Sequence, residues 1–321
     1  MSEFELIARI IPQLPRNESV VVGAGDDCAV LDFGIAGRLL LFKTDAVVEG
    51  IHFTKEAEPE KVGHKALARC LSDVAAMAGT PTHALVTLGL PRTFEVGFVD
   101  AIYRGLNRLA ARHEVAVVGG ETTTNPERSF ISVSVLGTVP KEKCILRSGA
   151  KVGDAIFVTG TLGGSLEGKH LEFEPRLAEA RWLAEHFEIH AMMDISDGLA
   201  SDLRHLMRAS GVGAELLSTA IPISRAARSS RRAAGDGSGL PAGGDGARKP
   251  PLLAALTDGE DFELLLTVAA SQAVILLDAW KERFADLPLT CIGRIMAEPG
   301  LLIRDKEGTR PLLEHGYVHF A

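Results

Sequence analysis

Cysteine is scarce in this sequence of 321 residues, which contains four cysteines spread widely along the chain. None of them forms a Cys-x-x-Cys pair, so the sequence argues against a zinc ribbon and against a disulfide framework. Long apolar runs are also absent, and the first residues lack the basic and then apolar pattern of a secretory leader. We therefore expect a protein of the reducing cytoplasm that does not cross a membrane.

Basic charge is in deficit as well, because 34 lysines and arginines stand against 42 aspartates and glutamates. The formal net charge of −8 argues against nucleic acid and against acidic membranes as partners, since both are polyanions. The chain also shows no nucleophile elbow, no dinucleotide-binding fingerprint and no internal repeat. The acidic residues are therefore the main candidates for carrying chemistry.

Length and composition predict a globular protein of two domains. The sequence is 46% hydrophobic and 24% charged, and 321 residues are too many for one ordinary core. A polar turn region at Pro140–Gly149 separates two sets of elements, so we expect an N-terminal domain over residues 1–140 and a C-terminal domain over residues 141–321. Some strand pairs are joined without a helix, so the fold class is α+β rather than a plain doubly wound α/β sheet.

Strand and helix patterns alternate through both halves. In the first half, the strand patterns cover Ala29–Phe33, Leu39–Lys43, Thr82–Leu90, Val115–Val118 and Phe130–Leu136, and the helical patterns cover Lys61–Gly79 and Phe94–His113. In the second half, the strand patterns cover Ala155–Thr159, Ala191–Ile195, Phe262–Thr267 and Thr290–Ile295, and the helical patterns cover Arg176–His186, Leu199–Ser210 and Ser271–Phe284. The segment Arg225–Pro251 is rich in Gly, Ser, Ala, Pro and Arg, which predicts a flexible insertion.

Two residue pairs that contain acids in the first half are ambiguous when taken alone. Asp26 and Asp27 follow a glycine-rich approach, and adjacent carboxylates repel each other unless a cation is near. An ordinary polar turn explains them equally well. Thr44 and Asp45 follow a predicted strand, where α/β folds often place site residues, but a simple strand end is the stronger explanation.

Asp73 is more informative than either pair. In the predicted helix it shares one side with Val62, Ala66 and Met77, which is otherwise apolar. An unpaired carboxylate on that side would cost several kcal/mol or become protonated, whereas a metal ion or a basic partner would remove the penalty. We therefore favour a functional role for Asp73.

A further acidic group lies where a predicted strand meets a predicted helix, at Asp194, Ser196 and Asp197. Asp197 alone could cap the helix, but a cap does not require Asp194 as well. Two acids that flank a serine at a helix N-terminus suit metal and phosphate oxygens together. Gly120 and Glu121 follow another predicted strand, where glycine allows a phosphate to approach the backbone closely.

Two further patterns imitate known motifs. The segment Gly163–His170 nearly spells a P-loop, but His170 replaces the hydroxyl that would hold magnesium. His186 and His190 are four residues apart without the Glu-x-x of a zinc protease between them. What remains is a set of acids on separate elements, glycine-rich turns and Arg147 near the domain boundary, which suits metal-assisted phosphoryl transfer.

In order and spacing, these segments resemble the thiamine-monophosphate kinase family of the aminoimidazole-ribonucleotide-synthetase-like superfamily. The likeness runs along the whole chain through Glu3–Ile7, Gly25–Val30, Thr44-Asp45, Glu49–Phe53, Leu71–Met77, Arg147–Ala150, Met193–Leu199, Gly259–Glu263 and Gly316–Phe320. It implies an N-terminal mixed-sheet domain that pairs with a second copy in a homodimer, where the site forms. It also implies ATP and thiamine monophosphate as substrates and several Mg²⁺ ions, with no general base.

Carried over position by position, the resemblance assigns roles to individual residues. The implied magnesium ligands are Asp27, Thr44, Asp45, Asp73, Glu121, Asp194 and Asp197. The implied nucleotide contacts are Gly120, Arg147, Ser196 and Tyr103. The implied contacts to the thiamine phosphate are His52, Glu260 and Tyr317. This sequence departs from the family pattern at Glu121, where Asp or Asn is usual, and at Gly164 and Asp258, where Asp and Gly are usual.

Two alternatives remain open from the sequence. Selenophosphate synthetase, in the same superfamily, requires a reactive Cys or selenocysteine with a Lys before the Gly-Asp-Asp turn, and residues 1–24 contain neither. A catalytically silent paralogue that binds a nucleotide or thiamine phosphate as a sensor has the substitution at Glu121 as its support.

Overall fold

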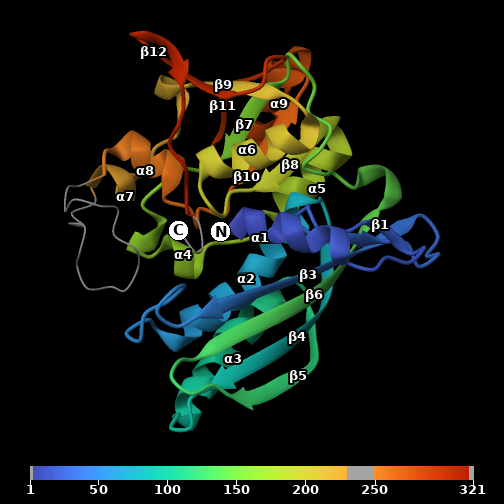
Figure 1. Cartoon of the computed structure of the whole chain (residues 1–321), viewed down its shortest axis with the longest axis vertical. Helices are drawn as coiled ribbons and strands as arrows, with labels where there is room; N and C mark the ends of the chain where they lie inside the picture. Colours follow the sequence, from blue (N-terminus) through green and yellow to red (C-terminus); the bar gives the residue numbers. More distant parts are fainter. Residues whose placement is uncertain (1–2, 230–248, 318–321) are drawn as a thin grey trace.

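The computed structural model describes residues 3–229 and 249–317, which form two sheets with helices packed between and around them (Figure 1). The N-terminal sheet has the strand order β1-β2-β3-β6-β4-β5. Its strands are β1 (Val20–Val22), β2 (Ala29–Leu31), β3 (Arg38–Val48), β4 (Thr80–Leu90), β5 (Ala116–Thr124) and β6 (Phe130–Pro140). Only the β4–β5 pair is parallel in this sheet, so the sheet is mixed, as predicted.

The C-terminal sheet has the strand order β13-β12-β9-β11-β7-β10-β8, with a parallel pair between β9 and β12. Its strands are β7 (Ala155–Thr159), β8 (Ile189–Asp194), β9 (Gly213–Leu217), β10 (Leu264–Val268), β11 (Leu289–Met296), β12 (Leu301–Asp305) and β13 (Gly308–Pro311). Two domains with mixed sheets and few simple β-α-β units are an α+β fold, so the predicted fold class is confirmed.

The helices differ in how deeply they are buried. They are α1 (Glu3–Ile10), α2 (Pro59–Ala76), α3 (Val96–Arg112), α4 (Lys169–Glu172), α5 (Leu177–His186), α6 (Leu199–Ser210), α7 (Arg225–Ser229), α8 (Pro251–Thr257) and α9 (Ala273–Arg283). Helix α2 packs against β3 and β6 of its own domain and also against α4, α5 and β8 of the other domain. It therefore lies between the two domains, and it is buried around most of its circumference.

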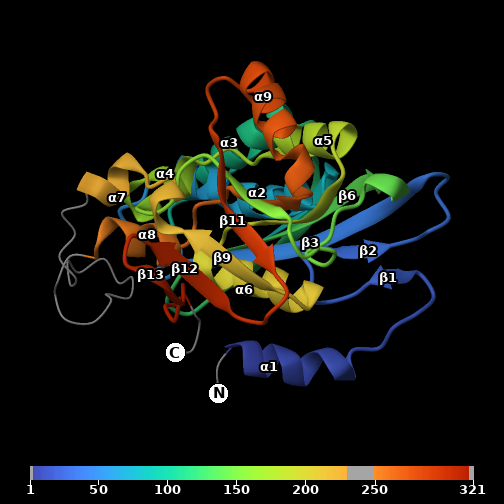
Figure 2. The ribbon, with the colours of Figure 1, turned by 90° about the horizontal axis from the view of Figure 1, so that it is seen from above.

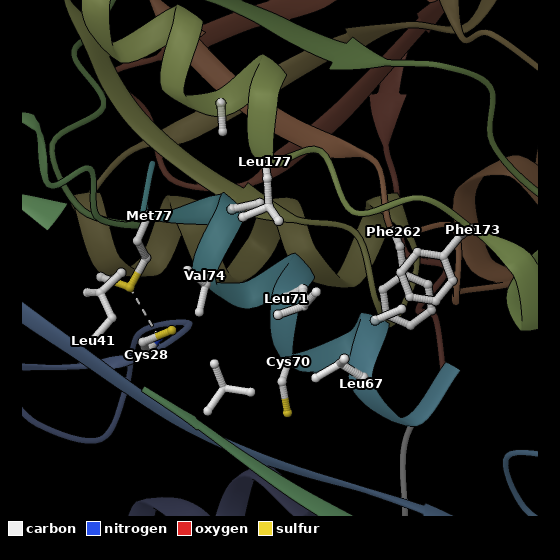
Figure 3. Close-up of a cluster of buried hydrophobic side chains, with 14 of the residues drawn as sticks. Cys28, Leu41, Leu67, Cys70, Leu71, Val74, Met77, Phe173, Leu177 and Phe262 are labelled. Atoms are coloured by element: carbon white, nitrogen blue, oxygen red, sulfur yellow. Dashed lines mark hydrogen bonds between the residues drawn. The ribbon is translucent and has the colours of Figure 1, made fainter. Parts of the chain in front are cut away.

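A hydrophobic cluster continues from α2 into the C-terminal domain (Figure 3). Leu67, Leu71 and Val74 of α2 are fully buried, and Phe173 stacks on Phe262 with ring centroids 3.9 Å apart. At the other end of the helix, the backbone N–H of Cys28 donates to Met77 Sδ at 3.1 Å, the contact dashed in Figure 3. The turn that carries Asp27 is thus tied to the end of α2.

The observed elements correct several predicted boundaries. Strand β3 continues to Val48 and β5 continues to Thr124, so Thr44, Asp45, Gly120 and Glu121 lie within strands and not after them. The ends of the predicted insertion are helical, because α7 begins at Arg225 and α8 begins at Pro251. Residues 230–248 of that insertion lie outside the described residues. The predicted patterns leave out α1, α4, α8, β1, β9, β12 and β13, all of which are eight residues long or shorter.

Among the described residues, helices pack on one face of the N-terminal sheet. Helices α2 and α3 lie together on that face, whereas α1 lies apart on the other side, with residues 5–10 exposed (Figure 2). Side chains on the opposite face remain exposed, among them Phe42, Leu85, Val118 and Leu136. We call these four residues the open sheet face. Within the described part of the chain, none of the helices combines the length and the apolar character needed to cross a membrane.

Candidate functional site

Three aspartates from three separate elements meet in the interior. Asp27 comes from the turn before β2, Asp73 from the last turns of α2, and Asp194 from the end of β8. One carboxylate oxygen from each lies within 4.8 Å of the others, and the residues are 1%, 6% and 3% exposed. We call these residues the carboxylate cluster. It joins both domains through the helix that lies between them.

Two cations and a hydroxyl contact the carboxylate cluster. Arg147 Nη2 lies 2.5 Å from Asp27 Oδ1, and Lys43 Nζ lies 2.7 Å from Asp73 Oδ1. Ser72 Oγ donates to Asp194 Oδ2 at 2.5 Å. Asp27 Oδ2 is buried and has no hydrogen-bond partner among the described residues. Such an oxygen is costly to bury unless a cation approaches it.

The electrostatics of the carboxylate cluster favour a metal ion. Burial, with the charge of Asp27 beside it, raises the pKa of Asp194 to about 6. Burial also raises the pKa of Asp73 well above its ordinary value, although the Lys43 ammonium acts in the opposite direction. Three buried carboxylates supply the oxygen ligands that Mg²⁺ prefers, and a divalent cation would remove the cost of keeping them ionised. The donor set and the unpartnered Asp27 oxygen therefore fit magnesium.

Asp26 has a different task from Asp27. Its Oδ1 accepts a hydrogen bond from the backbone N–H of Asp27 at 3.0 Å, and its carboxylate accepts from the backbone N–H of Arg147. Burial, together with the charge of Asp27, raises its pKa to about 6. Asp26 therefore shapes the turn and fixes the segment that carries Arg147.

A cavity of about 500 Å³ lies beside the carboxylate cluster. Its wall includes His52, Ser196, Asp197, Glu260 and Tyr317. All five had been assigned to ligand contacts or metal from the sequence. The junction between β8 and α6 connects the two places, since Asp194 enters the carboxylate cluster and the next residues form part of the cavity wall.

The backbone explains how distant segments reach this cavity. The backbone N–H of Tyr317 donates to the carbonyl of Asp197 at 2.9 Å, which holds the C-terminal segment over the junction. The backbone N–H of Glu260 donates to the carbonyl of Ser196 at 2.6 Å. His52 Nδ1 accepts from the backbone N–H of Val48 at 3.1 Å, which fixes the imidazole at the end of β3.

Asp45 lies between the carboxylate cluster and the cavity. Its Oδ2 is 3.5 Å from Nε of Arg69, a residue of the cavity wall. Burial raises the pKa of Asp45, but the charges of Arg69 and Lys43 outweigh burial and lower it overall. Asp45 is therefore an ionised carboxylate on the side of β3 that faces α2.

Thr44 and Glu121 are placed on the other face of the sheet. Neighbouring residues of a strand point to opposite faces, so Thr44 faces away from Asp45. Thr44 Oγ1 accepts from Ser134 Oγ at 3.1 Å. The register aligns Glu121 with Thr87 and Ser132 of the same face, and Glu121 is exposed on the edge strand β5. The side chains of Thr44 and Glu121 therefore lie on the same side of the sheet as the open sheet face.

The two remaining nucleotide candidates lie outside the cavity wall. Gly120 sits on β5, where a Cβ atom would lie 1.7 Å from the carbonyl oxygen of Val86. A side chain at that position is therefore excluded by the backbone of β4. Tyr103 on α3 is partly buried and packs against the main hydrophobic cluster. Within this one chain, neither residue joins the carboxylate cluster.

The segment that resembles a P-loop binds carboxylates of its own chain. The backbone N–H of Gly163 donates to both oxygens of Asp261 at 3.0 Å, and the backbone N–H of Gly164 donates to Asp258 Oδ2 at 2.9 Å. The two sequence departures at Gly164 and Asp258 are therefore in contact, and the carboxylate comes from position 258 in place of position 164. His186 and His190 make separate contacts, with the carbonyl of Trp182 and with Asp154.

Sequence reasoning missed the basic residues that the fold brings to the acids. Lys43, Lys65 and Arg69 each contact a predicted acidic residue, at Asp73, Glu260 and Asp45 respectively. Lys65 and Arg69 are four residues apart on one helix. Two basic residues on the same side of a helix that is otherwise buried are a sequence pattern that indicates buried acidic partners. Ser72 carries no comparable signal.

The two-sheet fold and the buried acids at its centre place this chain among the AIR synthase-related proteins. Residues 25–139 match the family described as AIR synthase related protein, N-terminal domain, and residues 151–300 match the corresponding C-terminal domain. Full-length relatives narrow the assignment, and the chain belongs to the thiamine-monophosphate kinase family.

Three similar proteins support that assignment. The thiamine-monophosphate kinase of Rhodopirellula baltica is 37% identical over 316 residues, which cover 96% of this chain and 93% of the relative. The thiamine-monophosphate kinase of Bacillus subtilis is 33% identical over the full length of both chains. A solved structure described as AaThiL complexed with AMPPCP and TMP aligns with a TM-score of 0.80 and 32% identity, covering 99% of this chain and 97% of that one.

Proposed function

We propose that this chain transfers the terminal phosphoryl group of ATP to thiamine monophosphate, yielding ADP and thiamine diphosphate. The carboxylate cluster is the observation that carries the proposal. It brings three buried acids together beside a cavity of about 500 Å³, and one carboxylate oxygen of Asp27 has no hydrogen-bond partner in the part of the chain that the structure describes. The membership of the chain in the thiamine-monophosphate kinase family supports the same reaction.

In this proposal, Asp27, Asp73 and Asp194 would hold magnesium, and Asp45 and Asp197 are further candidate ligands. Magnesium bound there would neutralise the charge of the phosphates during transfer. Arg147 contacts Asp27 and carries a guanidinium that phosphate oxygens favour. Ser196, beside the N-terminus of α6, is suited to a phosphate oxygen of the nucleotide.

The acceptor would occupy the cavity, with His52, Glu260 and Tyr317 in its wall. A phosphate monoester has a second pKa of about 6, so the nucleophilic oxygen is largely deprotonated near neutral pH. The protein therefore needs no general base. Its contribution is to bring two polyanions together and to exclude water from the reacting atoms.

We further propose that the active form is a homodimer paired through the N-terminal sheets. The open sheet face presents four apolar side chains, and the helices of residues 3–229 and 249–317 that pack on this sheet lie on its opposite side. A second copy would bury this face and would place a partner surface over Thr44, Gly120 and Glu121. Those implied nucleotide and metal contacts lie apart from the carboxylate cluster in the single chain, which supports a site completed by pairing.

All four cysteines are free thiols, which supports a reducing cytoplasm.

The test is turnover of thiamine monophosphate by the purified chain with Mg·ATP, followed by separation of thiamine diphosphate and ADP. We expect one thiamine diphosphate for each ADP, and loss of activity in Asp27→Asn. Asp278→Asn, which removes an exposed charge on α9, is the matched control and should retain full activity.

Three outcomes would contradict the proposal in different ways. Binding of both ligands without turnover would favour the sensor alternative. Transfer to another small phosphate ester, with none to thiamine monophosphate, would retain the phosphotransferase but overturn its substrate. Unchanged activity in Asp27→Asn would show that the carboxylate cluster is not the reacting centre.

A further inference from the structure

A fully buried lysine lies behind the cavity, and no part of the proposed reaction uses it. Lys65 on α2 is 0% exposed, and its Nζ lies 2.6 Å from Glu260 Oε2. The same ammonium donates to the carbonyl oxygen of His52 at 2.6 Å and contacts His170 Nδ1 at 2.8 Å. It therefore touches both His52 and Glu260, two of the three cavity residues that we assign to the acceptor.

His170 completes this arrangement from the C-terminal domain. Its Nδ1 lies 3.0 Å from Glu260 Oε2, and the residue is 6% exposed. Both basic contacts fall on the same oxygen of Glu260. Neither of these two contacts involves the other oxygen, Oε1.

The backbone of Glu260 is held just as firmly. Its φ of 53° lies in the left-handed region, which is unfavourable for a residue with a long side chain. The hydrogen bond from its N–H to the carbonyl of Ser196 fixes that conformation. Such a backbone conformation persists where surrounding contacts hold the residue in place, and Glu260 is held by contacts from both domains.

The charges agree with the geometry. Burial lowers the pKa of Lys65 to about 8, while Glu260 acts in the opposite direction, so the ammonium remains the main form near neutral pH. Burial raises the pKa of Glu260, but Lys65 and His170 outweigh it and bring the value to about 2. Glu260 is therefore an anion at the cavity wall, suited to an amino group or a cationic ring of a ligand.

We propose that Lys65 and His170 are positioning residues for acceptor binding, which hold the carboxylate of Glu260 and the His52 segment in the one arrangement that the acceptor recognises. This inference rests on the proposed function, because it assigns the acceptor to that side of the cavity. Neither residue lines the cavity, so they act through Glu260 and His52 and not by contact with the substrate. The acceptor site would then exist only while the two domains are in contact through α2.

The experiment compares steady-state constants of two substitutions with a matched control. Lys65→Met and His170→Leu remove the contacts to Glu260 and place an apolar side chain in the same space. We expect each to raise the KM for thiamine monophosphate by about tenfold or more, with the KM for ATP nearly unchanged. Lys61→Met is the control, because Lys61 lies one turn earlier on α2 and forms its described ion pairs with two exposed acids, Glu58 and Glu172.

A conservative variant separates positioning from general packing. His170→Asn presents an amide nitrogen near the place of Nδ1, and we expect it to restore most of the affinity that His170→Leu loses. Calorimetric titration with thiamine monophosphate, without ATP, gives the same comparison independently of turnover. This measurement remains informative if Lys65→Met does not fold, since removal of one partner of a buried pair is strongly destabilising.

The outcomes distinguish this inference from the proposed function. The unmodified chain could bind thiamine monophosphate without turning it over, while His170→Leu binds it more weakly. That result would overturn the proposed reaction and leave the positioning role intact. Equal losses for both substrates, or no rescue by His170→Asn, would show a structural role only. Unchanged affinity for thiamine monophosphate in His170→Leu would overturn the inference itself.

Discussion

Asp194→Asn should make the metal-free protein more stable and the enzyme inactive. The substitution retains the shape of the side chain and removes one charge from the carboxylate cluster. In the folded protein the pKa of Asp194 rises from 3.8 to about 6, with burial as the main cause and Asp27 as the next. A difference of that size corresponds to about 3 kcal/mol of lost stability when the group is ionised. The side chain is 3% exposed, so solvent screening reduces this value little.

The sign follows from proton binding. Because the pKa is raised on folding, the folded protein binds this proton more tightly than the unfolded chain does. The cost is absent below a pH of about 4, develops as the pH rises towards about 6, and is fully present above that. At roughly pH 7 in EDTA, the variant should therefore exceed the unmodified protein in unfolding free energy by up to about 3 kcal/mol. Ser72 can still donate to the amide oxygen of the new side chain, so that hydrogen bond is retained.

The assay is denaturant unfolding of both proteins in EDTA and again with excess magnesium chloride. Magnesium should stabilise the unmodified protein, by about 2.7 kcal/mol at a hundredfold excess over its dissociation constant. The variant should gain much less unfolding free energy from magnesium. The difference in stability between the two proteins should therefore shrink or change sign. Asp278→Asn should match the unmodified protein in both buffers. A variant that is less stable than the unmodified protein in EDTA would refute the reasoning, because burial of the charge would then carry no cost.

Three further predictions concern other contacts. Lys43→Met removes the ammonium 2.7 Å from Asp73 and should destabilise the EDTA-treated protein by about 3 kcal/mol, with a larger gain from magnesium than the unmodified protein shows in thermal melts; equal gains would contradict it. Phe42→Glu charges the open sheet face and should yield monomers by light scattering with folding intact, whereas an unchanged dimer would exclude this face as the interface. Trp280→Ala removes a buried ring, whose Nε1 donates to the Leu287 carbonyl, and should lower the unfolding free energy by about 3–5 kcal/mol in urea titrations; a loss below about 1 kcal/mol would contradict it.

Several features were determined by local sequence. The central strands and long helices follow from apolar periodicity, and β7 and α6 begin and end at the predicted residues. The burial of Asp73 followed from its spacing with apolar neighbours on α2. The ends of β3 and β5 were missed, because Thr44, Asp45 and the glycines of β5 resemble a strand end or turn when neighbouring strands are unknown.

Tertiary structure alone decided which candidate residues meet. Asp27 and Asp194 are far apart in the chain, and only the packing of both domains on α2 brings them to Asp73. Pleating separated Thr44 from Asp45, although they are adjacent in sequence. Which acids Lys43, Lys65 and Arg69 pair with was also decided by tertiary structure, because an ion pair depends on positions in space. The sequence by itself thus determined which residue types could carry the chemistry. The contact between domains decided which of these residues share a site, because the energy between charges depends on their distance and burial and not on their order along the chain.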